Sequence, residues 1–338
     1  MRANHMNRST RQRKGAKHKT SMALRQDRLG QTQRIARLIE WLKSPNGGEE
    51  AAFALIACGR PAVPALRHLL YERVLRQGTE PRCRAAKTLA AIGAKETLVG
   101  FLRAWHGSAD LTGSAEEQAV VNEAARALAG LRTEEFYQLL IHLAHRCPLP
   151  GVVEALGHFP RDETIPILIS ALEGDASRTA AEGALRRLAG TASQALASTA
   201  LTLAFSDDRE SASSLRRRRS ALELLNDTGT GHRHWRDLRP LIKDRDPMVA
   251  FLASKLILAA GGPSEKATAV DRMIALTADS DWFLAGEIED HLVAKSFAAP
   301  DVMSRVSAIL SKLSKEGGHE ERLSQTLKRI RERVHNGK

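Results

Sequence analysis

Residues 85–93 read Ala-Ala-Lys-Thr-Leu-Ala-Ala-Ile-Gly, and this phrase of small and aliphatic residues recurs along the chain. Each copy has one central aliphatic residue, and successive centres lie 28 to 39 residues apart. The centres are Leu55, Leu89, Leu128, Leu156, Leu185, Leu222, Leu256 and Ile288. A period of this length is typical of arrays of stacked helix pairs. It predicts an all-α fold, a right-handed α-α superhelix of about eight helix pairs.

The 338 residues divide into three predicted regions. Residues 1–30 are polar and basic without an apolar helical period, so we expect a disordered arm. Residues 31–316 carry the helix pairs of the solenoid. Residues 317–338 begin with two glycines and predict a more polar, basic helix that caps the array.

Local signals predict where several helices begin. Ser114 with Glu117 has the spacing of a capping box, and Thr133 is an N-cap candidate. Asp246 precedes Pro247, and proline is favoured in the first helical turn. Sustained period-2 alternation is absent, so we expect no sheet.

Two segments carry a family resemblance. Residues 62–66 read Ala-Val-Pro-Ala-Leu and residues 164–168 read Thr-Ile-Pro-Ile-Leu. Both resemble the second helix of HEAT repeats, especially the short bacterial HEAT-like repeats first described in phycobilisome lyases. The resemblance is close over residues 49–205 and loose over 206–316. It implies an armadillo-like solenoid that acts through an extended surface, and it implies little about chemistry.

The net charge of +12 is concentrated at the two ends. Residues 1–34 carry a net charge of +9 and residues 321–338 carry +4, so residues 35–320 are close to neutral at −1. The basic balance is therefore weak evidence that the folded body binds nucleic acid. The arm is the clearest polyanion-binding candidate, through Arg11, Arg13, Lys14, Lys17 and Lys19.

Composition also indicates the cellular compartment. Three cysteines at unrelated spacings do not form a disulfide framework, so we expect a reducing, cytoplasmic compartment. No apolar run is long enough to predict a membrane span. Alanine- and arginine-rich usage suggests a GC-rich bacterial gene.

The body contributes further binding candidates. Polar positions on predicted second helices could line an inner face: Arg67, Arg73, Arg103, Arg236 and Lys243. A second group surrounds an arginine run and a tryptophan: Arg216, Arg217, Arg218, Arg219, Arg233 and Trp235. Four consecutive arginines on a helix point in all directions, so at least one stem must lie along apolar surface. Trp235 could stack on a base, although packing into the seam between repeats is the favoured interpretation.

The sequence gives weaker support for an enzyme than for a binding protein. Alkylpurine DNA glycosylases are a HEAT-like class that needs an aromatic residue beside a carboxylate, for which Trp282 with Asp281 or Asp290 is the densest neighbourhood. His142, His145 and Cys147 lack a fourth metal ligand. Nucleotide-binding and nucleophile motifs are absent. We therefore expect no catalytic residues, metal or cofactor.

The sequence thus predicts a non-enzymatic HEAT-repeat scaffold that binds a protein partner through its extended surface. The basic arm would contact an acidic partner or nucleic acid. The alternative is a DNA-binding HEAT-like protein of the alkylpurine DNA glycosylase type. The sequence specifies no oligomeric state.

Overall fold

Helices occupy the positions that the apolar period predicts. The computed structural model describes residues 29–72, 78–106, 114–298, 300–316 and 321–336. Within these residues the fold is all-α apart from one short hairpin. The predicted arm lies outside the described residues, except that residues 29 and 30 begin a helix that continues to residue 42. By its contacts the chain forms two compact units, Met1–Ala155 and Leu156–Lys338.

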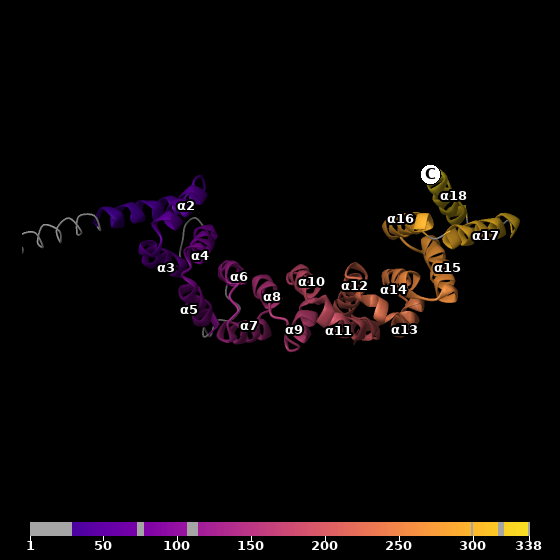
Figure 1. The fold of residues 1–338 in the computed structure, drawn as a ribbon, viewed down its shortest axis with the longest axis horizontal. Coiled ribbons are helices and arrows are strands. Elements are labelled where there is room, and N and C mark those ends of the chain that lie inside the picture. Colours follow the sequence, from indigo (N-terminus) through magenta and orange to yellow (C-terminus); the bar gives the residue numbers. More distant parts are fainter. Residues whose placement is uncertain (1–28, 73–77, 107–113, 299, 317–320, 337–338) are drawn as a thin grey trace, which may run out of the picture. The chain divides into compact units, whose positions relative to one another are not determined.

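Unit 1 contains successive helix pairs after the helix at residues 29–42. Its elements are α2 (Gly48–Cys58), η1 (Arg60–Ala62), α3 (Val63–Tyr71), α4 (Glu80–Ile92), α5 (Lys95–His106), α6 (Ala115–Ala127) and α7 (Glu134–Arg146), with α8 (Pro150–Leu156) at its end. Alternate helices contact one another: α4 packs against α2 and α6, and α5 packs against α7. Figure 1 shows the resulting two rows, with α2, α4 and α6 in one and α3, α5 and α7 in the other.

Unit 2 begins with the same alternation. Its elements are α9 (Thr164–Ala171), α10 (Arg178–Arg187), α11 (Ala189–Leu201), β1 (Phe205–Ser206), β2 (Arg209–Glu210), α12 (Ala212–Asp227), η2 (Thr230–Arg233), α13 (Trp235–Leu238), η3 (Arg239–Lys243), α14 (Pro247–Ala260), α15 (Pro263–Asp279), α16 (Trp282–Ala298), α17 (Pro300–Glu316) and α18 (Glu321–Asn336). Helix α12 contacts α10, α11 and α14. At the C-terminal end the pattern changes, because α18 packs against α15, α16 and α17 together.

The core is built from small and aliphatic side chains. The repeat centres Leu55, Leu89, Leu185 and Leu222 have no exposed surface, and Leu128 is almost as deeply buried. Alanines such as those at 85, 86, 124 and 125 are also fully buried, which lets helix backbones approach closely. The repeated phrase therefore supplies the packed face of the first helix in each pair.

Two expectations about secondary structure are wrong. The predicted absence of sheet is corrected by an antiparallel hairpin in which Phe205 pairs with Glu210. Asp207 and Asp208 form its two-residue turn, with φ of 51° and 64°. A turn of this type can join strands as short as these. The sequence also predicts one helix over residues 233–243 as the second member of the sixth pair. This segment is instead divided among η2, α13 and η3, where a proline at the start of η3 removes a backbone donor.

The predicted helix starts are confirmed. Side-chain oxygens of Ser114, Thr133 and Asp246 each accept a hydrogen bond from the backbone N–H three residues later, at 3.3, 3.3 and 2.9 Å. A capping box also predicts a hydrogen bond from the Ser114 backbone N–H to the Glu117 side chain, and this part of the prediction is wrong. The Glu117 carboxylate binds the Arg82 guanidinium through two hydrogen bonds, at 2.6 and 3.2 Å.

Candidate functional site

The four-arginine run of α12 is held by partners inside unit 2. Arg216 donates from Nη2 to the backbone oxygen of Glu173 at 3.1 Å, and Arg217 forms an ion pair with the carboxylate of the same residue. Arg219 binds Asp246, with Nε 3.0 Å from Oδ1. These side chains leave the helix in different directions, as consecutive helical positions must.

Arg218 is the most deeply buried member of the run, with no exposed side-chain surface. Its Nε donates to the Ala200 backbone oxygen at 2.8 Å and its Nη1 donates to Glu210 at 2.7 Å, while Nη2 binds Asp244. Burial alone would lower the pKa of this guanidinium, but hydrogen bonds to the two carboxylates raise the pKa above its usual value. One arginine of the run is therefore buried and bonded to polar groups of the same unit.

The same use of arginine recurs at other helix ends. Arg82, which is almost completely buried, donates from Nε to the Leu70 backbone oxygen at 2.9 Å, at the end of α3. Arg272 donates from Nε to the Ile242 oxygen at 3.0 Å, at the end of η3. The last carbonyls of a helix lack an intrahelical donor, and these guanidiniums supply one from the next part of the chain. Much of the arginine content of the body is therefore structural.

This arrangement gives the predicted binding run a structural role. The residues proposed from sequence as a binding run, Arg216, Arg217, Arg218 and Arg219, already hold the loops around α12. Their positive charges face carboxylates and backbone oxygens of the same unit. They do not form a shared surface for an external polyanion.

Basic residues with exposed side chains lie directly after α12. We call this segment the cationic ridge, and its exposed basic residues are His232, Arg233, Arg236, Arg239, Lys243 and Arg245. Among the described residues, only Arg239 of this set has an ion-pair partner, Glu265, at 4.0 Å. The ridge therefore presents positive charge to solvent, in contrast to the run before it.

Trp235 of the ridge is used by the fold. Its ring is partly buried against the apolar core of unit 2. The guanidinium of Arg236 lies over the ring, 5.5 Å from its centroid. These two contacts support packing in the seam over stacking on a base.

A groove runs along α3 and the start of α5 in unit 1. Its lining includes Val63, Pro64, Arg67, His68, Tyr71, Glu72 and Thr97, and its volume is about 760 Å³. A neighbouring hollow of about 440 Å³ shares Val63, Pro64 and Thr97 and adds Arg60, Ile92, Gly93, Ala94 and Glu96. We call the two together the α3–α5 groove.

The sequence of α3 explains which side chains face this groove. Leu66, Leu69 and Leu70 are buried against the core, so the remaining positions point outward. Arg67 lies beside the Tyr71 ring, 6.0 Å from the centroid. Only Arg67 of the groove was predicted from sequence. Its companions follow the helical spacing opposite the leucine stripe, and that spacing was the available signal.

The groove combines apolar surface with two arginines and two acids. Tyr71 also packs edge-on against Phe101, with centroids 5.4 Å apart, which fixes its ring at the groove wall. Among the described residues, Arg60 and Arg67 have no ion-pair partner, although Glu72 and Glu96 lie in the lining. Glu72 is 3.6 Å from Lys43, which draws this acid toward another cation.

The other predicted residues are placed as follows. Arg103 is exposed and pairs with Glu135 at 2.6 Å, which joins α5 to α7. Arg73 lies outside the described residues. The same holds for the residues predicted in the arm: Arg11, Arg13, Lys14, Lys17 and Lys19.

The residues that the sequence suggests for base excision, Trp282, Asp281 and Asp290, make other contacts in the structure. Trp282 is 82% exposed, and Asp281 accepts a hydrogen bond from the Leu284 backbone N–H at 2.8 Å as a helix cap. Asp290 pairs with Arg333 at 2.8 Å. Asp281 therefore serves as a helix cap and Asp290 as an ion-pair partner.

The remaining questions for the described part of the chain are metal binding and membrane crossing. There, no group of three or more His, Cys, Asp or Glu side chains could hold a metal ion. His142 is hydrogen-bonded through Nδ1 to the Gln138 backbone oxygen at 2.6 Å. None of the described helices combines the length and the apolar character needed to cross a bilayer. No protein-family model matches the chain, and no curated protein matches it significantly.

Proposed function

We propose that the protein is a non-enzymatic scaffold that binds an acidic segment of a protein partner in the α3–α5 groove. In this proposal the helix pairs form a HEAT-like right-handed superhelix of about eight pairs. Contacts between alternate helices within each unit support such stacking. The observation that carries the binding role is the groove itself, where exposed Arg60 and Arg67 lie beside apolar surface.

The chemistry of the groove favours a peptide with carboxylates. Arg67 and Tyr71 supply a planar cation and a fixed aromatic ring, the residue types that contribute most at protein interfaces. Pro64 adds a rigid apolar contact that loses no side-chain entropy on binding. The basic arm, through residues 11–19, would raise the encounter rate with the same acidic partner.

Site-specific photocrosslinking tests the binding role. A photoreactive residue replaces His68 in the groove, and a second version carries it at Glu50 on α2 as a control. In an extract of the source cells we expect one protein to crosslink through His68 and not through Glu50. Equal labelling at the two positions would contradict a binding groove.

Affinity for the captured partner then tests the chemistry. Arg60→Glu with Arg67→Glu is expected to weaken binding at least tenfold, because two attractive charges become repulsive. The matched control is Arg34→Glu with Arg37→Glu, which makes the same charge change at exposed positions of the helix 29–42. Equal losses for the two double variants would show that only net charge matters and would reject the groove.

The cationic ridge favours DNA binding as a second candidate function. Binding of the full chain to duplex DNA is measured across salt concentration, because each phosphate contact contributes about 0.9 to the log-log slope. One variant replaces five of the basic arm residues, Arg11, Arg13, Lys14, Lys17 and Lys19, with glutamine. Another replaces Arg233, Arg236 and Lys243 with glutamine. A slope lowered by the ridge variant would assign DNA binding to the body, whereas a slope lowered only by the arm variant would assign it to the arm. Absence of binding would reject this candidate.

A further inference from the structure

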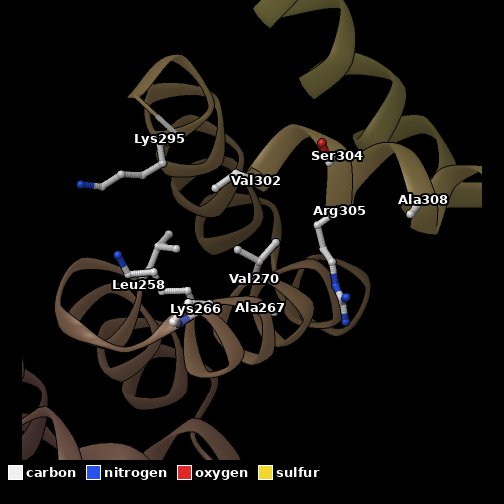
Figure 2. Close-up of a pocket in the computed structure, with 10 residues that line it drawn as sticks. Leu258, Lys266, Ala267, Val270, Lys295, Val302, Ser304, Arg305 and Ala308 are labelled. Carbon is white, nitrogen blue, oxygen red and sulfur yellow. The ribbon is translucent and has the colours of Figure 1, made fainter. Parts of the chain in front are cut away.

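A pocket opens among the C-terminal helices of unit 2. Its volume is about 410 Å³, within the range of small-molecule sites, and it is lined from the end of α14, the start of α15, the end of α16 and α17. Leu258, Val270 and Val302 form an apolar floor, and each is at least nine-tenths buried. Figure 2 shows Val270 and Val302 in the middle of the pocket, between facing helices.

The charged side chains at this pocket are all of one sign. Among the described residues that line it, Lys266, Lys295 and Arg305 are cationic and none is acidic. In Figure 2, Lys295 extends at one side of the pocket and Arg305 lies at the other. Such a lining attracts an anion and repels a cation.

Two of these cations lack a compensating charge. Lys266 and Lys295 are half-buried, and neither has an ion-pair partner among the described residues. Arg305, in contrast, is paired with Asp271, with Nε 2.6 Å from Oδ1. Glu265, the chain neighbour of Lys266, lies 4.0 Å from Arg239. A partly desolvated ammonium group without a partner is unfavourable, and an anionic ligand would relieve that cost.

The neighbouring histidine responds to the same positive field. His291 on α16 lies against Phe251, with ring centroids 6.1 Å apart. Burial, together with the positive charges of Lys255 and Lys295, lowers its pKa to about 4. Positive charge on His291 is thus disfavoured, mainly by burial and also by the nearby Lys255 and Lys295.

We propose that this pocket binds an anionic amphiphile with a single alkyl chain. The carboxylate or phosphate head group would lie between Lys266 and Lys295, and the chain would cover Leu258, Val270 and Val302. One molecule would then contact both the apolar floor and the lysines of the pocket. This site lies apart from the residues of the proposed groove, so the two proposals stand or fall separately.

Titration calorimetry with the full chain tests the ligand class. Decanoate and decyl phosphate are the anionic probes, and decanol and decyltrimethylammonium have the same chain without negative charge. We expect saturable binding of at least one anion, at least tenfold tighter than either control. Preference between the two anions identifies a carboxylate or a phosphate head group. Absence of saturable anion binding, or equal binding of decanol, would overturn the proposal.

Variants locate the bound molecule. Lys266→Gln with Lys295→Gln is expected to weaken anion binding at least tenfold, whereas Lys243→Gln with Arg233→Gln makes the same charge change outside the pocket and should have little effect. Ala267→Leu would fill the pocket and abolish binding, with helical content checked by circular dichroism. If anion affinity survives both the lysine pair and Ala267→Leu, the molecule binds elsewhere and the proposal is wrong. Arg60→Glu with Arg67→Glu should leave anion binding unchanged.

Discussion

Arg218 forms an ion pair with Asp244 at a point where the arginine side chain has no exposed surface. The same guanidinium binds Glu210 beside the hairpin and the Ala200 backbone oxygen at the end of α11. One side chain therefore connects α12, the hairpin, the end of α11 and the start of the α14 region. A charge in this position is tolerated because all of its donors face acceptors.

Removing the Arg218 side chain should strongly destabilise unit 2. Arg218→Met keeps much of the volume but leaves Asp244 and Glu210 buried without their partner. Loss of one member of a buried pair costs about 3–5 kcal/mol. Urea unfolding followed by circular dichroism measures the change, and Arg218→Lys should recover little because an ammonium cannot reach three separated acceptors.

Arg233→Met is the matched control, because it makes the same substitution at an exposed residue of the same unit. It is expected to change the free energy of unfolding by less than about 0.5 kcal/mol. Similar losses for Arg218→Met and Arg233→Met would show that the buried network contributes nothing beyond surface charge.

Gly151 should tolerate no side chain. A Cβ at this position would lie 2.1 Å from the Asn122 backbone oxygen, and the Gly151 N–H donates to the Asn122 side chain at 2.7 Å. Gly151→Ala must therefore separate α6 from α8 and is expected to cost about 2 kcal/mol or more. Gly100→Ala is the control in α5, where a Cβ meets nothing within 4 Å. That change should stabilise the chain by about 0.5–1 kcal/mol, and equal effects of the two variants would contradict the close contact.

Local sequence signals predicted the helices well, because periodicity and capping act over a few residues. The N-caps at Ser114, Thr133 and Asp246 are examples. Contacts between residues far apart in the sequence could not be predicted in this way. Glu117 sits at the spacing of a capping box, yet its carboxylate binds Arg82, 35 residues away.

In the candidate site, too, local features could be predicted and long-range contacts could not. Sequence grouped the α12 arginines as one basic feature, but their partners come from loops that are distant along the chain, such as the one carrying Glu173. Arg67 was identified correctly as a polar position on a second helix, and the structure places it in a groove. That groove depends on how α3 packs beside α5, which a pattern within one helix does not specify.

The Cys83 thiol should react slowly with alkylating reagents. Burial, together with the negative charges of Glu80 and Glu123, raises its pKa to about 11. Only the thiolate is strongly nucleophilic, so at pH 8 very little of this group is reactive. Mass spectrometry after a short iodoacetamide pulse should find much less labelling of Cys83 in the folded chain than in urea. Equal labelling would contradict the raised pKa.

Acid should weaken unit 2 through His291. The folded state lowers the pKa of this imidazole from 6.5 to about 4, so below pH 6.5 the unfolded chain binds a proton that the folded chain excludes. This contribution to stability is complete above pH 6.5 and is lost progressively as the pH falls toward 4. Allowing for partial exposure, the loss is about 2 kcal/mol.

Carboxylates also titrate in this range, so the test is a difference between two proteins. His291→Leu cannot take up a proton in either state, and its free energy of unfolding relative to wild type should improve by about 2 kcal/mol between pH 7.5 and 4.5. Any constant effect of the substitution on packing cancels in that comparison. His232→Leu is the control at an exposed histidine and should show no such trend. Nuclear magnetic resonance of the wild-type imidazoles supplies a direct check, because a His291 that titrates near pH 6.5 in the folded protein would refute both the buried neutral ring and the predicted acid sensitivity.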